Sequence, residues 1–210
     1  TLIEFTPLHS HDLSAYNVII LAHGSPTEPL SPQALPKLTE WVENGGTLIT
    51  TGSAYKLTNK AKITDFKTLS QGKKKDKAEG NAHIEYQPYH NTAKSKSGIE
   101  GVIFNCHLDI TSPLGYGYEN PNVAIMKNGT TVMDFSQIKG SSPMQYTKQP
   151  YLSGCVSLEN IKRISNAPAS IVSGCGIGNV IWFADDLNYR SYWFGGTKIF
   201  MNAIYFGQLY

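Results

Sequence analysis

The stretch NVIILAHGSPTEPLSPQALPKLTEWVENGGTLITT, residues 17–51, decides the fold. Its first apolar run, residues 18–21, is continuous and is bounded by polar residues, which is typical of a strand covered on both faces. Apolar residues then recur at helical spacing: Leu35, Leu38, Trp41 and Val42. The pair Gly45-Gly46 ends this helical pattern, and a second buried strand follows at 47–51. The spacing predicts a strand–helix–strand unit with a parallel, right-handed crossover.

Short strands dominate the pattern of the second half. They are predicted at residues 101–110, 122–127, 130–135, 169–174 and 179–185. Asn128-Gly129 predicts a hairpin between the second and third of these strands, and the glycines at 174–178 predict a tight hairpin turn between the last two. A helix is predicted at 197–206. The whole pattern indicates an α/β fold with a parallel sheet flanked by helices and an antiparallel extension, in one domain over residues 1–210.

The composition is that of a globular protein. The chain has 210 residues, of which 40% are hydrophobic and 16% charged, and no apolar run approaches the length of a membrane span. The formal charge of +2 is uneven, because residues 56–77 hold eight lysines and two aspartates, so that this segment is +6 and the remainder −4. Residues 69–98 form a polar insertion without periodicity. The lysines lack the interleaved arginine and aromatic residues of a nucleic-acid site, so no nucleic-acid partner is predicted.

The sequence contains no motif typical of a cofactor or metal site. None of the six histidines begins an H-x-x-E or H-x-x-x-H pattern, which would put two zinc ligands on one helical face. The glycines at 174–178 lead into a strand and not into a helix N-terminus, so they do not predict a phosphate cradle. The three cysteines form no C-x-x-C pair. We therefore expect no cofactor in this chain.

The sequence offers two candidate nucleophiles, Ser53 and Cys106. The turn after the second strand, TGSAY at 51–55, stands where an exposed nucleophile sits in hydrolase folds, but the two key places of a G-x-Ser-x-G or G-x-Cys-x-G elbow hold Ala54 and Lys56. Ser53 is either a displaced nucleophile or, as we favour, a helix cap. Cys106 next to His107 is either a Cys–His pair or, as we favour, a buried structural thiol, since adjacent strand residues point to opposite faces.

An acidic and aromatic segment, FADDLNYRSYWFGG at 183–196, follows the last predicted strand. In open α/β sheets ligands bind beyond the carboxyl ends of the strands, so this segment is a candidate site for a peptide or a carbohydrate, with Tyr189 and Tyr192 contributing aromatic surface. The candidate ligand-binding residues are Asp185, Asp186, Arg190, Trp193 and Asp109. The alternative is structural: the aspartates cap turns, Arg190 pairs with an acid and the aromatics cover the core.

Four blocks of the sequence carry a family resemblance. They are DLSAYNVIILAHG, LTEWVENGGTLITTGSAYKL, GVIFNCHLDITSPLGYGY and GNVIWFADDLNYRSYWFGGTKIFMNAIYFG. In this order they resemble the C-terminal domain of bacterial zinc carboxypeptidase-like proteins, which is similar in fold to class I glutamine amidotransferases. The sequence departs from that family at Ser112, where the family has a histidine, and it starts after the strand and helix with which the family domain opens.

The resemblance implies a flavodoxin-like, class I glutamine amidotransferase-like fold. It also implies a parent protein that is extracellular or periplasmic, with zinc held in a separate catalytic domain, and a preceding peptidase domain as the partner of this chain. The expected function is that of a non-catalytic accessory domain, which supports or positions the peptidase domain or its substrate. The alternatives are a hydrolase or amidotransferase-like enzyme that uses Cys106 or Ser53, and a carbohydrate- or peptide-binding module.

Overall fold

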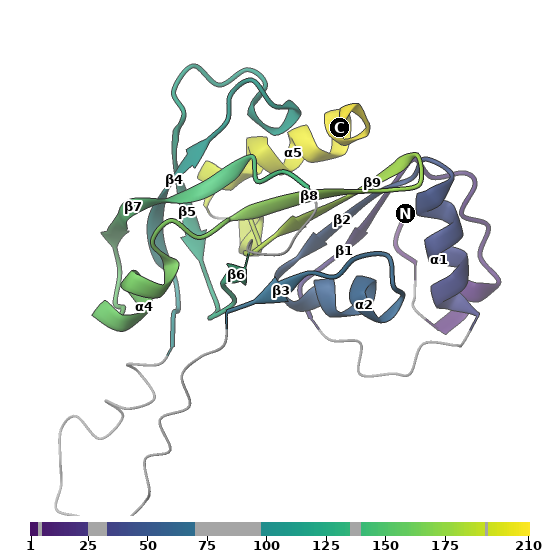
Figure 1. Ribbon diagram of the computed structural model, residues 1–210, viewed down its shortest axis with the longest axis horizontal. Helices are drawn as coiled ribbons and strands as arrows, with labels where there is room; N and C mark the ends of the chain where they lie inside the picture. Colours follow the sequence, from purple (N-terminus) through teal and green to yellow (C-terminus); the bar gives the residue numbers. More distant parts are fainter. Residues whose placement is uncertain (4–5, 25–32, 70–97, 135–139, 192) are drawn as a thin grey trace, which may run out of the picture.

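A four-stranded sheet runs through the middle of the molecule (Figure 1). The computed structural model describes residues 1–3, 6–24, 33–69, 98–134, 140–191 and 193–210. The strands lie in the order β1 (Val18–Leu21), β2 (Thr47–Thr51), β9 (Gly178–Phe183) and β8 (Ser170–Cys175). The first three are parallel and β8 is antiparallel to β9. The predicted strand–helix–strand unit is confirmed, because α1 (Ala34–Glu43) connects β1 to the parallel strand β2.

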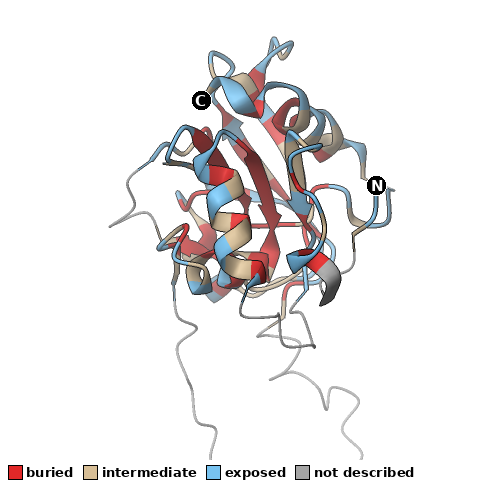
Figure 2. Cartoon of the chain, turned by 90° about the vertical axis from the view of Figure 1, so that its right-hand side faces the viewer, coloured by how far each residue is buried: buried red, intermediate tan, exposed pale blue. Residues whose placement is uncertain are grey.

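The two faces of this sheet pack on different partners. Alternate residues of β2 and β9 point toward α1 and α2 (Tyr55–Lys60), as expected for strands covered on both sides. These are Leu48, Val180 and Trp182. The residues between them face α5 (Thr197–Phe206) and a second sheet, and they are Ile49, Ile181 and Phe183. In Figure 2 the strands are mostly red, while the helix in front of them alternates between buried and exposed residues. Burial of the Phe183 side chain alone contributes about 1.5–3 kcal/mol.

The second sheet is antiparallel, in the order β5 (Asn122–Lys127), β4 (Val102–Leu108) and β7 (Met144–Ser153). The strands at β4 and β5 were predicted, whereas β7 and the following helix α4 (Leu158–Ile164) were not. The register of β4 against β7 shifts between Phe104 and Cys106. Pro150 lies in this irregular part, where a residue without an N–H group does least harm to the ladder.

The predicted hairpin at Asn128-Gly129 is wrong. In the part of the chain that the structure describes, β5 pairs with β4, while β6 (Met133–Asp134) pairs with β3 (Lys67–Thr68) in a separate two-stranded sheet. The connection between β5 and β6 is hydrogen-bonded to another segment: the backbone N–H of Gly129 donates to the carbonyl of Ile99 at 2.8 Å. The two apolar runs therefore diverge after the turn.

The predicted turn between β8 and β9 is confirmed. Cys175 pairs with Gly178, which leaves a two-residue loop of Gly176 and Ile177. Gly176 has φ 62°, a backbone conformation that hairpin turns of this length require and that glycine adopts without strain. A Cβ atom there would lie 2.5 Å from the carbonyl oxygen of Glu43 in α1, so glycine also allows the hairpin to approach the helix.

Two other predictions concern the polar insertion and membrane-spanning segments. Residues 70–97, which make up nearly all of the polar insertion at 69–98, lie outside the described residues, as do the lysines at positions 73–77. Among the residues that are described, no helix is long and apolar enough to cross a membrane.

Candidate functional site

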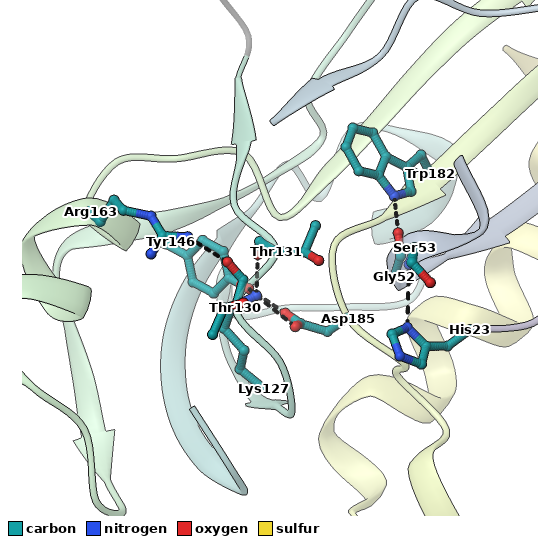
Figure 3. Close-up of polar contacts among 10 residues, drawn as sticks. All are labelled: His23, Gly52, Ser53, Lys127, Thr130, Thr131, Tyr146, Arg163, Trp182 and Asp185. Carbon is teal, nitrogen blue, oxygen red and sulfur yellow. Dashed lines mark hydrogen bonds and ion pairs between the residues drawn. The ribbon is translucent and has the colours of Figure 1, made fainter. Parts of the chain in front are cut away.

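Three parallel strands end side by side at one edge of the central sheet. Leu21 of β1 is in register with Thr50 of β2, and Thr51 of β2 with Phe183 of β9. The residues just beyond these ends, His23, Gly52 and Asp185, consequently lie along this carboxyl edge, which Figure 3 shows in close-up. This is the edge at which open α/β sheets bind their ligands.

Gly52 occupies the sharp turn that follows β2. Its φ of 52° lies in the left-handed region, and the chain turns there from the strand into a short 3-10 helix, Gly52–Ala54. The sequence predicted Ala54 at the nucleophile position, but Ala54 has φ −63° and is buried. The elbow residue with left-handed backbone is therefore Gly52, two positions earlier. A Cβ atom on Gly52 would lie 1.9 Å from Nδ1 of His23. The imidazole therefore fills the space that a nucleophilic side chain would need.

Ser53, in the turn after β2, is hydrogen-bonded to the two residues His23 and Gly24 that follow β1 (Figure 3). The backbone N–H of Ser53 donates to Nδ1 of His23 at 3.3 Å, and the Ser53 hydroxyl donates to the carbonyl of Gly24 at 3.1 Å. A histidine that accepts at Nδ1 carries its proton at Nε2 in the neutral form. Nδ1 already accepts a hydrogen bond from the Ser53 backbone N–H, and the Ser53 hydroxyl donates elsewhere. In this arrangement His23 therefore does not accept a hydrogen bond from the Ser53 hydroxyl, as a general base would have to do.

Trp182 fixes the other side of the turn. Its indole Nε1 donates to the carbonyl oxygen of Gly52 at 3.0 Å, and its side chain is completely buried. The rings of Tyr55 and Phe66 lie 4.4 and 5.0 Å from it, measured between centroids. The elbow is thus held between Trp182, which donates to the Gly52 carbonyl, and His23, which accepts from the Ser53 N–H (Figure 3).

A buried polar cluster lies at the end of β9, beside the elbow (Figure 3). Nζ of Lys127 is 2.7 Å from Oδ1 of Asp185, and the hydroxyl of Tyr146 donates to Oδ2 of the same carboxylate. The exposed fractions of these side chains are 0% for Lys127 and 3% for Asp185. Both carboxylate oxygens are therefore bound by protein groups, since a buried charge must be paired and hydrogen-bonded. Burial, with a further contribution from the Asp185 carboxylate, raises the pKa of Tyr146 well above its usual value.

The same lysine holds the connection after β5. Nζ of Lys127 also donates to the carbonyl of Thr131 at 2.7 Å, while the guanidinium of Arg163 in α4 donates to the carbonyl of Thr130. Oδ1 of Asn160 accepts a second hydrogen bond from Arg163 at 3.1 Å. In place of a hairpin ladder, the carbonyls of Thr130 and Thr131 thus accept hydrogen bonds from the side chains of Arg163 and Lys127.

Cys106 lies in the middle of β4 and is completely buried. The neighbouring residue His107 is exposed, so the two side chains point to opposite faces as predicted. Burial raises the pKa of the Cys106 thiol well above its usual value, the Asp185 carboxylate raises it further, and Lys127 opposes this shift. The predicted burial of Cys106 is confirmed. A thiol in these surroundings is a poor nucleophile, so the structure agrees with a structural thiol, and that role stays a prediction.

The segment after β9 contains most of the predicted ligand-binding residues. Oδ1 of Asp186 accepts from the backbone N–H of Asn188 at 3.2 Å, so this carboxylate supports a turn. The guanidinium of Arg190 lies 5.2 Å from the centroid of the Tyr189 ring, and Arg190 has φ 51°. The indole of Trp193 donates to the carbonyl of Ala124 in β5. Tyr192 lies outside the described residues. Ligand binding by this segment stays a prediction.

Asp109 does not join the other candidates. It follows the carboxyl end of β4, whereas Lys127 is in register with Val102 at the beginning of that strand, so Asp109 and the Lys127–Asp185 pair lie at opposite ends of β4. Oδ1 of Asp109 accepts from the backbone N–H and the hydroxyl of Thr111 at 2.9 and 2.7 Å. These hydrogen bonds lower the pKa of Asp109.

The structure adds residues to the candidate site that the sequence did not indicate, namely His23, Lys127, Tyr146 and Trp182. A lysine that follows an apolar strand and precedes Asn128-Gly129 is typical of a solvated turn, so its burial had no local signal. The only local hint at His23 and Gly52 was that each follows an apolar strand. Within the described ranges, no group of three or more His, Cys, Asp or Glu side chains could hold a metal ion.

Comparisons with known proteins support the fold. No family model and no curated protein matches the sequence. The chain is similar in structure to a ThuA-like protein from Parabacteroides merdae, with a TM-score of 0.59 and 11% identity over 94% of this chain and 72% of that one. It is also similar to a cytoplasmic protein from Salmonella typhimurium, with a TM-score of 0.51 and 15% identity over 98% and 76% of the two chains.

A second ThuA-like protein, from Bacteroides uniformis, has a TM-score of 0.50 and 12% identity over 93% of this chain and 72% of that one. At such identities the likeness concerns the fold alone. The chain has a mixed α/β fold of the flavodoxin-like, class I glutamine amidotransferase-like type, with a parallel sheet flanked by helices and an antiparallel extension.

Proposed function

We propose that this chain is a non-catalytic accessory domain that acts by binding or supporting another domain. The observation that carries the proposal is the glycine at the elbow: Gly52 has the left-handed backbone of a nucleophile turn, and the His23 ring fills the place of a side chain there. Catalysis by nucleophilic attack requires a side chain at that place and a base within reach of it. Here Ser53 donates to a carbonyl and the Cys106 thiol is buried, so neither replaces the missing group.

The partner in this proposal is a zinc peptidase domain of the same protein. It is suggested by the resemblance of four sequence blocks to the C-terminal domain of zinc carboxypeptidase-like proteins. In such a protein zinc would be held by the peptidase domain, and this chain would support that domain or position its substrate. By the same resemblance we place the protein outside the cytoplasm, in the periplasm or the extracellular space.

The test compares the natural polypeptide that contains this chain with the same polypeptide lacking it. We expect zinc-dependent release of a C-terminal amino acid from peptides by both forms, with a lower melting temperature or a higher KM when this chain is removed. The proposal would be overturned if the polypeptide contained no peptidase domain, or if removing this chain changed neither stability nor KM.

A peptide- or carbohydrate-binding role of residues 185–193 is the second candidate. It is favoured by two consecutive residues with left-handed backbone, Arg190 at φ 51° and Ser191 at φ 54°, because such strain in residues other than glycine is concentrated at functional sites. Binding of peptides or glycans that perturbs the fluorescence of Trp193, and that is lost in Arg190→Ala, would support this role. Unchanged fluorescence with both ligand classes would exclude it.

A further inference from the structure

A cavity of about 500 Å³ lies between the segment that precedes β1 and the C-terminal half of α1. Its walls come from residues 12–14, 16 and 17 on one side, and from α1 and residues 44–46 on the other. The volume falls within the range of small-molecule sites. Because it lies beside the beginnings of β1 and β2, this cavity is at the amino edge of the central sheet, opposite to the Gly52 elbow.

Trp41 forms a fixed aromatic wall of the cavity. Its indole Nε1 donates to the carbonyl of Tyr16 at 3.0 Å, which ties the helix to the segment before β1. The absence of a side chain at Gly46 allows the ring to lie against the backbone, since a Cβ atom at that position would be 2.6 Å from the indole. The orientation of this aromatic surface is therefore set before any ligand binds.

The charged groups of the cavity are mainly acidic. Asp12 and Glu40 both line it, and neither takes part in an ion pair within the described part of the chain. Lys37 is the basic residue of the lining, and its ammonium donates to the carbonyls of His9, at 3.1 Å, and His11. Its charge also acts on the Asp12 carboxylate, so the two carboxylates and this ammonium leave the lining with one net negative charge. Oδ1 of Asp12 accepts from the backbone N–H of Ser14 at 2.9 Å, and hydrogen bonds from Ser14 lower the pKa of this carboxyl.

The end of α1 supplies no free carbonyl to the cavity, because the carbonyls of residues 40–43 all accept backbone N–H groups. The groups of the lining that attract a cation are therefore the two carboxylates and the indole. Carboxylates pair with a cation through their charge, and an indole attracts it through the electrons of its ring.

We propose that this cavity binds an organic cation, namely a guanidinium or ammonium group carried on an apolar chain. Asp12 and Glu40 pair with the charge, and the indole of Trp41 packs against the cation and its apolar stem. The cation can be a free small molecule or the basic side chain of a peptide, because both present the same chemistry. The proposal does not depend on the accessory role proposed above, because it concerns the opposite edge of the sheet.

The experiment titrates the folded chain with N-acetylarginine amide and, in parallel, with N-acetylcitrulline amide, which has the same shape without the charge. Calorimetry measures the affinity, and tryptophan fluorescence reports the site. We expect the arginine derivative to bind about tenfold more tightly than the citrulline derivative. The fluorescence change should persist in Trp193→Phe and disappear in Trp41→Phe. A basic tripeptide with arginine in the middle distinguishes the two sources: tighter binding than the amide indicates a peptide ligand, and weaker binding a free small molecule.

Variants of the two carboxylates complete the test. Asp12→Asn and Glu40→Gln should each weaken binding of the arginine derivative about threefold or more, whereas Glu43→Gln, which changes an exposed carboxylate of the same helix outside the cavity lining, should leave it unchanged. Urea unfolding of each variant shows that it is folded. Equal affinity for both derivatives, no detectable binding of either, or unchanged affinity in both carboxylate variants would overturn the proposal. Tighter binding of a neutral sugar such as N-acetylglucosamine would also overturn it.

Discussion

Nζ of Lys127 lies 2.7 Å from Oδ1 of Asp185, and neither side chain is accessible to solvent beyond 3%. The pair connects the end of β5, in the antiparallel sheet, to the residues that follow β9 in the parallel sheet. Tyr146 of β7 and the carbonyl of Thr131 complete the hydrogen bonding of the two charges. One ion pair thus joins the two sheets at the carboxyl edge, where the elbow also lies.

Removing one member of this pair should destabilise the protein strongly. Lys127→Met leaves the Asp185 carboxylate buried without its counter-charge, and we expect the free energy of unfolding to fall by about 3–5 kcal/mol. Urea unfolding followed by circular dichroism measures this loss. The double variant Lys127→Met/Asp185→Leu should recover most of it, because no charge then remains buried.

The matched control is the ion pair of Lys67 and Asp65, whose atoms are 3.5 Å apart and whose side chains are 42% and 85% exposed. Lys67→Met should cost about 1 kcal/mol or less. If Lys127→Met proved as mild as Lys67→Met, the buried pair would not have the structural role described above.

The stability of the protein should decrease at alkaline pH. Burial raises the pKa of Cys106 and of Tyr146 above their usual values of 9.0 and 10.0. The folded state therefore keeps protons that the unfolded state releases, so the stabilisation is fully present below these usual values and is lost as the pH rises above them. Urea midpoints between about pH 8 and about pH 11 should fall, and the fall should be smaller in Cys106→Ala. A midpoint that rises over this range would contradict the direction of both shifts.

The three cysteines should differ in their rates of alkylation. Cys106 is buried with a raised pKa, whereas Cys155 is exposed. Iodoacetamide at mildly alkaline pH should modify Cys155 first and should reach Cys106 only when urea unfolds the chain. Peptide mass spectrometry resolves the sites. Rapid modification of Cys106 in the folded protein would instead favour the alternative in which this thiol is a nucleophile.

The elbow should not accept a side chain. Gly52→Ala introduces a Cβ atom 1.9 Å from the His23 ring at a residue with φ 52°, so we expect a loss of roughly 2–4 kcal/mol from steric overlap and backbone strain together. Gly101→Ala separates the two causes, since Gly101 has φ 66° but no atom within 4 Å of its Cβ position. That variant should lose about 1–2 kcal/mol.

The double variant His23→Ala/Gly52→Ala removes the overlap and should return to the cost of Gly101→Ala. Thermal or urea unfolding compares all three variants. If the double variant were no more stable than Gly52→Ala, the His23 ring would not be the group that fills the elbow.

The sequence predicted the parallel core because its signals are local. The apolar runs of β1 and β2, the helical spacing of α1 and the glycine turn at Gly176 each specify their own conformation. The strand β7 was missed because its sequence, MQYTKQPYLS, is polar and contains a proline, and it is positioned by the neighbouring strand β4. Helix α4 is short and gave too few turns for a periodic signal.

The candidate site was predicted less well, since its key contacts join distant parts of the chain. Asp185 was expected to bind a ligand, yet both of its oxygens are bound by Lys127 and Tyr146, which are 58 and 39 residues away in the sequence. A lysine beside an Asn-Gly pair carries no local sign of burial. The elbow motif placed the turn correctly but put the nucleophile position at Ala54, whereas the residue with left-handed backbone is Gly52. The groups around it come from distant parts of the chain: Trp182 of β9 donates to the Gly52 carbonyl, and His23 accepts from the next backbone N–H.

We propose that the described residues at the carboxyl edge of the sheet carry no nucleophile, and a measurement of hydrolysis by the chain alone tests this proposal most directly. The measurement follows release of nitrophenol from acetyl esters and of nitroaniline from amides by the wild type, Ser53→Ala and Cys106→Ala at matched concentrations, with labelling by a fluorophosphonate probe. We expect rates equal to the buffer background in all three proteins and no label on Ser53. Saturable hydrolysis by the wild type that is lost in Ser53→Ala or Cys106→Ala would contradict it.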